Sequence, residues 1–96
     1  MKKKVAILGV TGSVGQEFVQ SLKDHPWFEV TQIAASERSA GKKYIDSIRD
    51  PDSGILKWEV GGEMPEYIKE MPVKAIDEVN SAELDLVFSA IESGAA

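Results

Sequence analysis

Three glycines spaced by three residues follow a short apolar run near the start of the chain, in the stretch VAILGVTGSVG at residues 5–15. A helical pattern begins directly after the last glycine. Because glycine lacks a Cβ atom, this turn lets the backbone come close to a bound group. A helix that starts there points free N–H groups and a partial charge of about +0.5 at that group. The order of strand, glycine turn and helix is typical of a site for the pyrophosphate of a dinucleotide.

The spacing of these glycines is a variant of the common dinucleotide fingerprint. That fingerprint is G-x-G-x-x-G, whereas this turn is G-x-x-G-x-x-G, with Val10 where the first glycine of the common form would stand. A glycine triplet alone is a weak signal, and its alternative is a tight turn that binds nothing. The position between an apolar strand and a helix favours the binding turn.

Length and composition restrict the class of protein. The 96 residues suffice for one small domain, and 43% hydrophobic residues allow a packed core. The chain has no cysteine, which excludes disulfides, thiolate metal sites and a cysteine nucleophile within it and fits a reducing compartment. The acidic residues between 46 and 52 lack the spacing of a calcium loop, so no metal site is predicted. The apolar run after Lys2–Lys4 is too short for a signal peptide or a membrane span. We therefore expect a cytoplasmic protein without a membrane partner.

Charge is distributed unevenly along the chain. The net charge is −5, with +3 on residues 1–49 and −8 on residues 50–96. Such a chain is an unlikely partner for nucleic acid. The basic half contains the glycine turn, which suits a small phosphorylated ligand.

Strand and helix patterns alternate along the sequence. The patterns predict strands at 5–8, 30–35, 73–76 and 84–90, a helix at 13–23, a short edge strand at 55–60 and one or two helical turns at 66–71. Val14, Phe18 and Leu22 recur every four residues of the predicted helix, with Gly15 and Val19 on the same face. Pro26 then limits the helix.

This alternation predicts the fold class. We expect an α/β fold with a Rossmann-like, doubly wound parallel sheet that is incomplete and represents the N-terminal portion of the fold. Ligands bind such sheets beyond the carboxyl ends of the strands. The segments 9–15, 36–39 and 89–92 follow three of the predicted strands, so they should converge on one cleft.

The residues after the second predicted strand favour NADP as the cofactor. NAD-binding folds usually place Asp or Glu there to accept hydrogen bonds from the ribose. Here Ser36 stands at the strand tip and Arg38 follows two residues later. Hydroxyls and a guanidinium suit a 2′-phosphate, with each charge-assisted hydrogen bond worth about 1.5–3 kcal/mol. Glu37 leaves an NAD-type ribose contact open.

Four sequence blocks together resemble a known enzyme family. The blocks are GVTGSVG, HPWFEV, AASERSAGKKY and DLVFSA. In this order they resemble the N-terminal part of aspartate-semialdehyde dehydrogenase, most closely its archaeal and fungal branch. The resemblance is strong over residues 4–45 and 84–91 and loose between them. It implies an NADP-dependent oxidoreductase that converts L-aspartate 4-semialdehyde and phosphate into L-aspartyl 4-phosphate, in the biosynthesis of lysine, threonine and methionine.

The resemblance also assigns roles to individual residues. It implies that the glycine turn binds the NADP pyrophosphate, that the serine–arginine segment binds the 2′-phosphate and that the end of the fourth strand approaches the nicotinamide. The residues concerned are Gly9, Thr11, Gly12, Ser13, Val14 and Gly15 for the first role, Ser36, Arg38 and Ser39 for the second, and Ser89 and Ala90 for the third.

The catalytic residues of that family have no counterpart in this chain. The family uses a cysteine nucleophile, a histidine base and substrate-binding arginines, all further along the chain. Here cysteine is absent, and the single histidine, His25, lies in the block HPWFEV and is interpreted as structural. We therefore expect residues 1–96 to be the N-terminal part of an NADP-binding Rossmann domain, inactive alone. The resemblance implies that the intact enzyme carries a catalytic and dimerisation domain, binds the substrate there and is a homo-oligomer.

Two other interpretations stay open at this point. One is a related NADPH-dependent reductase that acts on an acyl-CoA or on N-acetyl-glutamyl phosphate. The other is a stand-alone, non-catalytic nucleotide-binding module. An unfinished parallel sheet leaves strand edges and apolar faces uncovered, so the sequence also predicts that the chain associates with itself.

Overall fold

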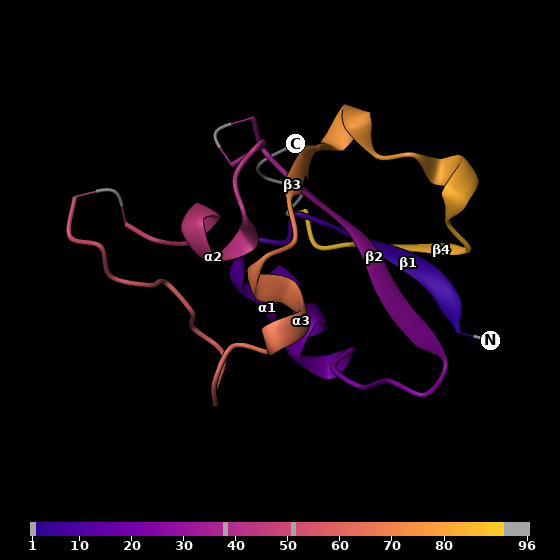
Figure 1. Cartoon of the computed structure of the whole chain (residues 1–96), viewed down its shortest axis with the longest axis horizontal. Helices are drawn as coiled ribbons and strands as arrows, with labels where there is room; N and C mark the ends of the chain where they lie inside the picture. The colour runs from indigo at the N-terminus through magenta and orange to yellow at the C-terminus, as the bar shows by residue number, and fades with distance from the viewer. Residues whose placement is uncertain (1, 38, 51, 92–96) are drawn as a thin grey trace.

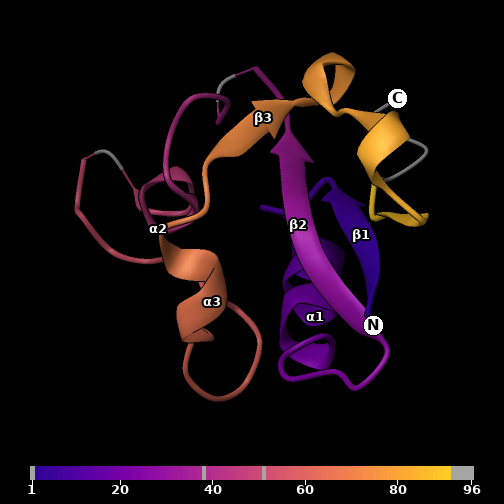
Figure 2. The same cartoon turned by 45° about the vertical axis from the view of Figure 1, so that its right-hand side comes forward.

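A four-stranded parallel sheet forms the centre of the computed structural model, which describes residues 2–37, 39–50 and 52–91. The strands are β1 (Lys3–Leu8), β2 (Phe28–Ala35), β3 (Val73–Ala75) and β4 (Leu86–Ser89). The helices are α1 (Ser13–Ser21), α2 (Tyr44–Ser47) and α3 (Glu66–Lys69), with 3₁₀ turns η1 (Ile76–Glu78) and η2 (Ser81–Glu83). The strand order is β3-β2-β1-β4, and every pair is parallel. Figure 2 shows β3, β2 and β1 side by side and pointing the same way. The predicted Rossmann-like parallel α/β fold is confirmed.

The connections between strands lie on both faces of the sheet. In Figure 1, α1 and α3 lie below the sheet, while the segment with η1 and η2 lies above it. The chain winds outward from β1 to β2 and β3, and then returns to place β4 on the other side of β1. The direction of winding therefore changes between β1 and β4. In open α/β sheets, ligands bind beyond the carboxyl ends of the strands at this change.

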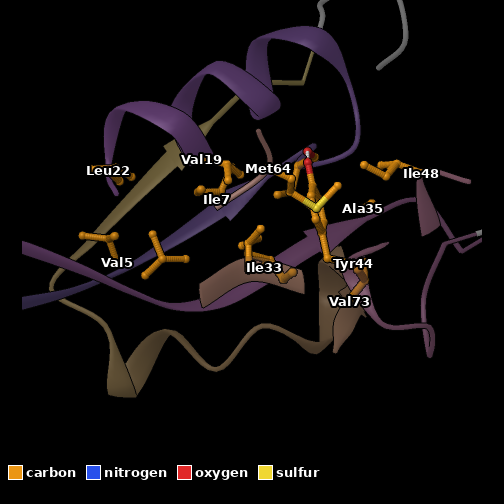
Figure 3. Close-up of a cluster of buried hydrophobic side chains, with 13 residues drawn as sticks. Val5, Ile7, Val19, Leu22, Ile33, Ala35, Tyr44, Ile48, Met64 and Val73 are labelled. Carbon is orange, nitrogen blue, oxygen red and sulfur yellow. Dashed lines mark hydrogen bonds between the residues drawn. The ribbon is translucent and has the colours of Figure 1, made fainter. Parts of the chain in front are cut away.

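The core lies between the sheet and the helices α1 to α3. Side chains alternate between the two faces of a strand, so Val5 and Ile7 of β1 point to the same layer as Ile33 of β2. Figure 3 shows these side chains against Val19 of α1, with Tyr44 crossing the layer toward the start of that helix. The whole cluster comprises Val5, Ile7, Val10, Val19, Leu22, Val30, Ile33, Ala35, Tyr44, Ile48, Met64, Ile68 and Val73.

Two buried glutamines fasten connecting segments to this framework. Gln16 of α1 is 2% exposed and Gln32 of β2 is 7% exposed. The Gln32 amide donates to the carbonyl oxygen of Asn80 at 3.0 Å and accepts from the Asn80 N–H at 2.9 Å and the Lys74 ammonium at 3.2 Å. Gln32 thereby fixes the connection between η1 and η2. The contacts of Gln16 face the opposite side of the sheet.

Several predicted element boundaries differ from the observed ones. The predicted edge strand at 55–60 is absent. Leu56 makes only an isolated bridge to Arg49, and no ladder of backbone hydrogen bonds continues from it. The predicted helix of 13–23 ends at Ser21, since the backbone turns to a φ of +53° at Asp24. Val14 was predicted on the buried helix face but is 43% exposed, because it stands on the outer side of the first turn.

No helix in the described ranges combines the length and the apolar character that crossing a membrane requires.

Candidate nucleotide-binding site

The glycine turn joins the carboxyl ends of three strands. The N–H groups of Gly9 and Val10 both donate to the carbonyl oxygen of Ala34 at the end of β2, at 2.9 and 3.1 Å. Gly9 has a φ of +74°, and a Cβ placed on it would lie 3.1 Å from the carbonyl carbon of Ala90, directly after β4. Glycine is required at this position both for its backbone conformation and for the close approach of β1 to β4.

The other two glycines of the turn differ in the space around them. A Cβ on Gly15 would overlap the carbonyl oxygen of Gly9 and lie 2.7 Å from Cα of Val10. Gly15 therefore lets α1 pack on the turn. Gly12 has an ordinary φ of −77°, and the nearest atom to a Cβ there is the Gly9 oxygen at 3.8 Å. The protein itself thus leaves the space beside Gly12 open.

The amino-terminal end of α1 is uncapped. Gly12 is the N-cap residue and supplies no side-chain hydrogen bond, and the first turn of the helix contains no acidic residue. Ser13 and Val14 are exposed. The free N–H groups and the positive end of the helix dipole can therefore serve an anion.

A polar pocket of about 480 Å³ lies beside this turn. Its lining residues come from the glycine turn, from the segment after β2 and from the region 42–57. They are Thr11, Ser36, Ser39, Lys42, Ser47, Ile48, Arg49 and Lys57. Three cations and four hydroxyl groups line the pocket, and none of the lining residues named is acidic. The pocket is therefore suited to a ligand with a compact negative charge.

The three cations of the pocket differ in their own contacts. The Arg49 guanidinium donates to the carbonyl oxygen of Gly54 at 2.9 Å, and the Lys57 ammonium lies 4.0 Å from a carboxylate oxygen of Asp50. Lys42 lines the pocket, whereas its neighbour Lys43 does not. Sequence reasoning missed Arg49 and Lys57. The signal for Lys57 was that it is a single basic residue in an otherwise acidic stretch of the chain.

Lys43 is bound elsewhere on the surface. Its ammonium lies 2.7 Å from a carboxylate oxygen of Glu70. The hydrogen bond to Glu70 raises the pKa of Lys43, with a smaller opposing effect of desolvation. Both side chains are mostly exposed, so we attribute no stability to the pair. Of these two adjacent lysines, only Lys42 lines the pocket, so a substitution of Lys43 can serve as the control for the same substitution of Lys42.

Glu37 lines a different hollow. This hollow measures about 320 Å³ and also includes Ala75 and Asp77 near the end of β3. From the sequence, Glu37 was a candidate acceptor for the ribose hydroxyls of NAD. It is not among the residues that line the larger pocket. Ser36 borders both hollows.

The predicted binding residues fall into three groups in the structure. Those of the pocket are Thr11, Ser36 and Ser39, those of the turn and helix start are Gly9, Gly12, Ser13, Val14 and Gly15, and the one that touches the turn from β4 is Ala90. Ser89 is exposed at the end of β4 and does not line the pocket. Arg38 and Glu92 lie outside the described residues. The ends of β1, β2 and β4 thus lie together at the glycine turn, but of the three predicted segments only 9–15 and 36–39 contribute described residues to the pocket.

His25 contacts its own neighbours at the turn into β2, as a structural residue does. Its Nδ1 atom accepts a hydrogen bond from the Trp27 N–H at 3.1 Å, and its ring lies 4.9 Å from the ring of Phe28. These residues lie at the amino-terminal ends of the strands, near a hollow of about 510 Å³ lined by Leu22, Tyr67 and others. That hollow is slightly larger than the pocket beside the glycine turn but contains none of the predicted binding residues.

A family model for the NAD-binding domain of semialdehyde dehydrogenase matches residues 4–96. The chain belongs to the semialdehyde dehydrogenase family. As an NAD-binding domain of this family, it combines the observed parallel sheet with a glycine turn at the point where the winding changes direction.

Individual relatives bear the name that the four sequence blocks indicated. Aspartate-semialdehyde dehydrogenase of Archaeoglobus fulgidus is 41% identical over 93 residues, which are 97% of this chain and 24% of the relative. The enzyme of Schizosaccharomyces pombe is 44% identical over 91 residues, 95% of this chain and 23% of the relative. The resemblance to the archaeal and fungal enzymes is confirmed. The chain spans about a quarter of the length of the curated relatives that it matches.

Solved structures agree with this assignment. The aspartate semialdehyde dehydrogenase of Candida albicans, solved with NADP, superimposes with a TM-score of 0.81 and 39% identity over 98% of this chain and 24% of the other. Aspartate semialdehyde dehydrogenase II of Vibrio cholerae superimposes with a TM-score of 0.62 and 20% identity over 98% of this chain and 25% of the other. At this identity the match shows the shared fold alone.

Proposed function

We propose that the chain binds NADP in the pocket beside the glycine turn, as the nucleotide-binding part of an aspartate-semialdehyde dehydrogenase. The observation that carries the proposal is the group of Lys42, Arg49 and Lys57 around Ser36 and Ser39, with no acidic residue among the described residues that line the pocket. A 2′-phosphate offers such cations and hydroxyls a compact dianion with several acceptor oxygens, whereas a bare ribose hydroxyl offers them no charge.

The residues present fit the remainder of the cofactor as well. The uncapped start of α1 and the open space beside Gly12 suit a pyrophosphate that approaches the backbone closely. We assign this contact to Gly9, Thr11, Gly12, Ser13, Val14 and Gly15, and we assign Ala90 and Ser89 to the nicotinamide side. Arg38, predicted from the sequence, stays a 2′-phosphate ligand in this proposal.

For the whole protein we propose the reaction that the family name states. L-aspartate 4-semialdehyde, phosphate and NADP would give L-aspartyl 4-phosphate and NADPH, with hydride chemistry supplied by the bound cofactor. The residues of this chain would bind and orient the cofactor. A cysteine nucleophile for the aldehyde would come from outside these 96 residues. The cytoplasmic location and the homo-oligomeric state of the intact enzyme belong to the same proposal.

Calorimetric titration of the 96-residue chain with NADP and with NAD tests the cofactor proposal. We expect NADP to bind at least tenfold more tightly than NAD, which corresponds to about 1.4 kcal/mol. Adenosine 2′,5′-bisphosphate should show the same advantage over adenosine 5′-monophosphate, because the difference resides in one phosphate. Equal affinity within each pair would contradict the proposal.

A pair of lysine variants locates the binding site. Lys42→Ala should lower the affinity for NADP about tenfold, because it removes a cation that lines the pocket. Lys43→Ala should leave that affinity unchanged, because Lys43 is paired with Glu70 outside the pocket. Equal losses in both variants would mean that the effect is long-range electrostatics and not a contact at this pocket.

A further inference from the structure

Gln16 lies under the loop that completes the pocket. It is 2% exposed, on the first turns of α1 directly after Gly15. Its amide nitrogen donates to the carbonyl oxygen of Thr11 and to that of Lys57, each at 3.0 Å. Its amide oxygen accepts from the N–H of Glu59 at 2.7 Å. One buried side chain thus ties the glycine turn to residues 57–59, which are more than 40 positions away in the sequence.

These contacts fix two walls of the pocket relative to each other. Thr11 and Lys57 both line it, and both accept a hydrogen bond from the same Gln16 amide. The segment around Lys57 belongs to no strand and has exposed neighbours such as Ile55, which is 66% exposed. Its other backbone anchor near this point is the bond from the Lys57 N–H to the carbonyl oxygen of Ile48 at 2.8 Å. Without Gln16, the Lys57 backbone would keep the bond to Ile48 but lose the bond at its carbonyl group, so the long side chain would start from a less firmly held backbone.

We propose that Gln16 is a positioning residue for cofactor selection, because it holds Lys57 at the wall of the pocket where the 2′-phosphate of NADP is bound. This inference rests on the proposed function, which already includes Lys57 in the 2′-phosphate site, and adds Gln16 as the residue that positions Lys57 there. Gln16 acts through Lys57 and does not touch the cofactor.

The chain offers a matched control in Gln32. Gln32 is buried like Gln16, makes three hydrogen bonds through its amide and also ties a loop to the framework, but its partners Lys74 and Asn80 lie outside the pocket. Replacing either glutamine by methionine keeps the approximate size of the side chain and removes its hydrogen bonds. Both variants should lose stability, and only one should lose cofactor discrimination.

The test measures NADP and NAD affinities of Gln16→Met, Gln32→Met, Lys57→Gln and the double variant Gln16→Met/Lys57→Gln. Gln16→Met and Lys57→Gln should each lower the ratio of NADP to NAD affinity by roughly five- to tenfold. The double variant should fall no further than Lys57→Gln alone, and Gln32→Met should keep the ratio of the unaltered chain. Because Lys57 is exposed, Lys57→Gln folds even if Gln16→Met does not, and an unchanged ratio in Lys57→Gln overturns the proposal.

Hydrogen exchange of the free protein gives a readout that does not depend on the cofactor. Gln16→Met should speed exchange of the Glu59 amide, and Gln32→Met should speed exchange of the Asn80 amide, because each loses its acceptor. Faster Glu59 exchange with equal losses of NADP and NAD affinity would make Gln16 a purely structural residue and would overturn the proposal. An unaltered chain that does not prefer NADP would instead overturn the proposed function itself.

Discussion

Individual residues of the glycine turn serve different purposes, although the sequence motif treats them alike. A side chain on Gly9 would crowd the backbone of Ala90, and one on Gly15 would collide with the backbone of Val10. Gly12 has room for a methyl group, so within the described structure its small size serves no packing purpose. Under the proposed function, its place in the motif is explained by the pyrophosphate, which needs the space that a side chain would fill.

Two alanine substitutions separate these purposes. Gly15→Ala should destabilise the chain by about 1–3 kcal/mol or more, because the new Cβ overlaps backbone atoms of the turn. Gly12→Ala should change the free energy of unfolding by less than about 0.5 kcal/mol. It should still weaken NADP binding about tenfold, since the methyl group occupies the space proposed for the pyrophosphate. Urea denaturation and calorimetric titration measure the two effects, and full NADP affinity in Gly12→Ala would remove the pyrophosphate from this turn.

Two buried tyrosines should make the free energy of unfolding decrease at alkaline pH. The Tyr44 hydroxyl donates to the carbonyl oxygen of Val10 at 2.9 Å, and that of Tyr67 donates to the carbonyl oxygen of Val19 at 2.7 Å. Burial raises the pKa of both phenols in the folded state. Above the ordinary pKa of about 10, the unfolded chain releases protons that the folded chain retains, so stability should fall by up to about 1.4 kcal/mol per pH unit for each tyrosine.

Denaturation at pH 8 and at pH 10–11.5 tests this linkage. The double variant Tyr44→Phe/Tyr67→Phe should be less stable at pH 8, because two buried carbonyl oxygens lose their donors at about 1–3 kcal/mol each. Its loss of stability above pH 10 should be shallower than that of the unaltered chain. Parallel declines in the two proteins would assign the alkaline transition to the lysines instead.

At the scale of the element, α1 starts at an uncapped glycine, and its end is set by backbone geometry. The helix starts without a side-chain cap and stops at Ser21, two residues before the predicted end. Asp24 then takes a φ of +53°, the only positive φ of a non-glycine residue in the described chain. The chain reverses here to enter β2, and a Cβ atom in this conformation is unfavourable.

Relief of this conformation should stabilise the chain. Asp24→Gly should raise the free energy of unfolding by about 0.5 kcal/mol, because glycine accepts a positive φ and this gain exceeds its greater entropy when unfolded. Lys23→Gly is the matched control: without a positive φ to relieve, it should lower stability by about 0.5–1 kcal/mol. Chemical denaturation of the three proteins decides between them, and a destabilised Asp24→Gly would mean that the aspartate itself favours the turn.

At the scale of the whole molecule, β4 is the outer strand with an open edge in the described sheet. The outer edge of β3 is covered at Val73, whose N–H and carbonyl groups bond to Lys42 and Gly41 at 2.8 Å each. β4 pairs with β1 alone and β3 with β2 alone among the described strands. Leu86 and Val87 of β4 are 42% and 44% exposed. A strand edge flanked by exposed apolar side chains is a template for pairing with another chain.

Self-association of the 96-residue chain should follow from this edge. Sedimentation velocity should give a mean mass that rises with protein concentration, and Val87→Lys should reduce that rise, because a charge opposes pairing at an edge. Ser21→Lys, on an exposed position of α1, adds the same charge elsewhere and should leave the association unchanged. A monomer at all concentrations, or equal effects of the two variants, would show that β4 is not the contact.

The sequence determined the parts of this protein that depend on local order along the chain. The apolar runs predicted all four strands and their parallel arrangement, and the four blocks predicted the family, because strands, turns and motifs are continuous stretches of residues. Local patterns did not reveal the short helix α2, which is stabilised by Tyr44 in the core, nor did they correctly describe residues 55–60. That loop is held by Gln16, a partner more than 40 positions away.

The tertiary structure decided which residues meet. It brought Lys42, Arg49 and Lys57 together with Ser36 in one pocket and placed Glu37 in another hollow. It also distinguished Lys42 from Lys43, which are adjacent and chemically identical in the sequence. Charge and hydroxyl groups can be counted from the sequence, but their effect on a ligand depends on distance and direction. Those quantities exist only once the loop between α2 and α3 is folded back against the glycine turn.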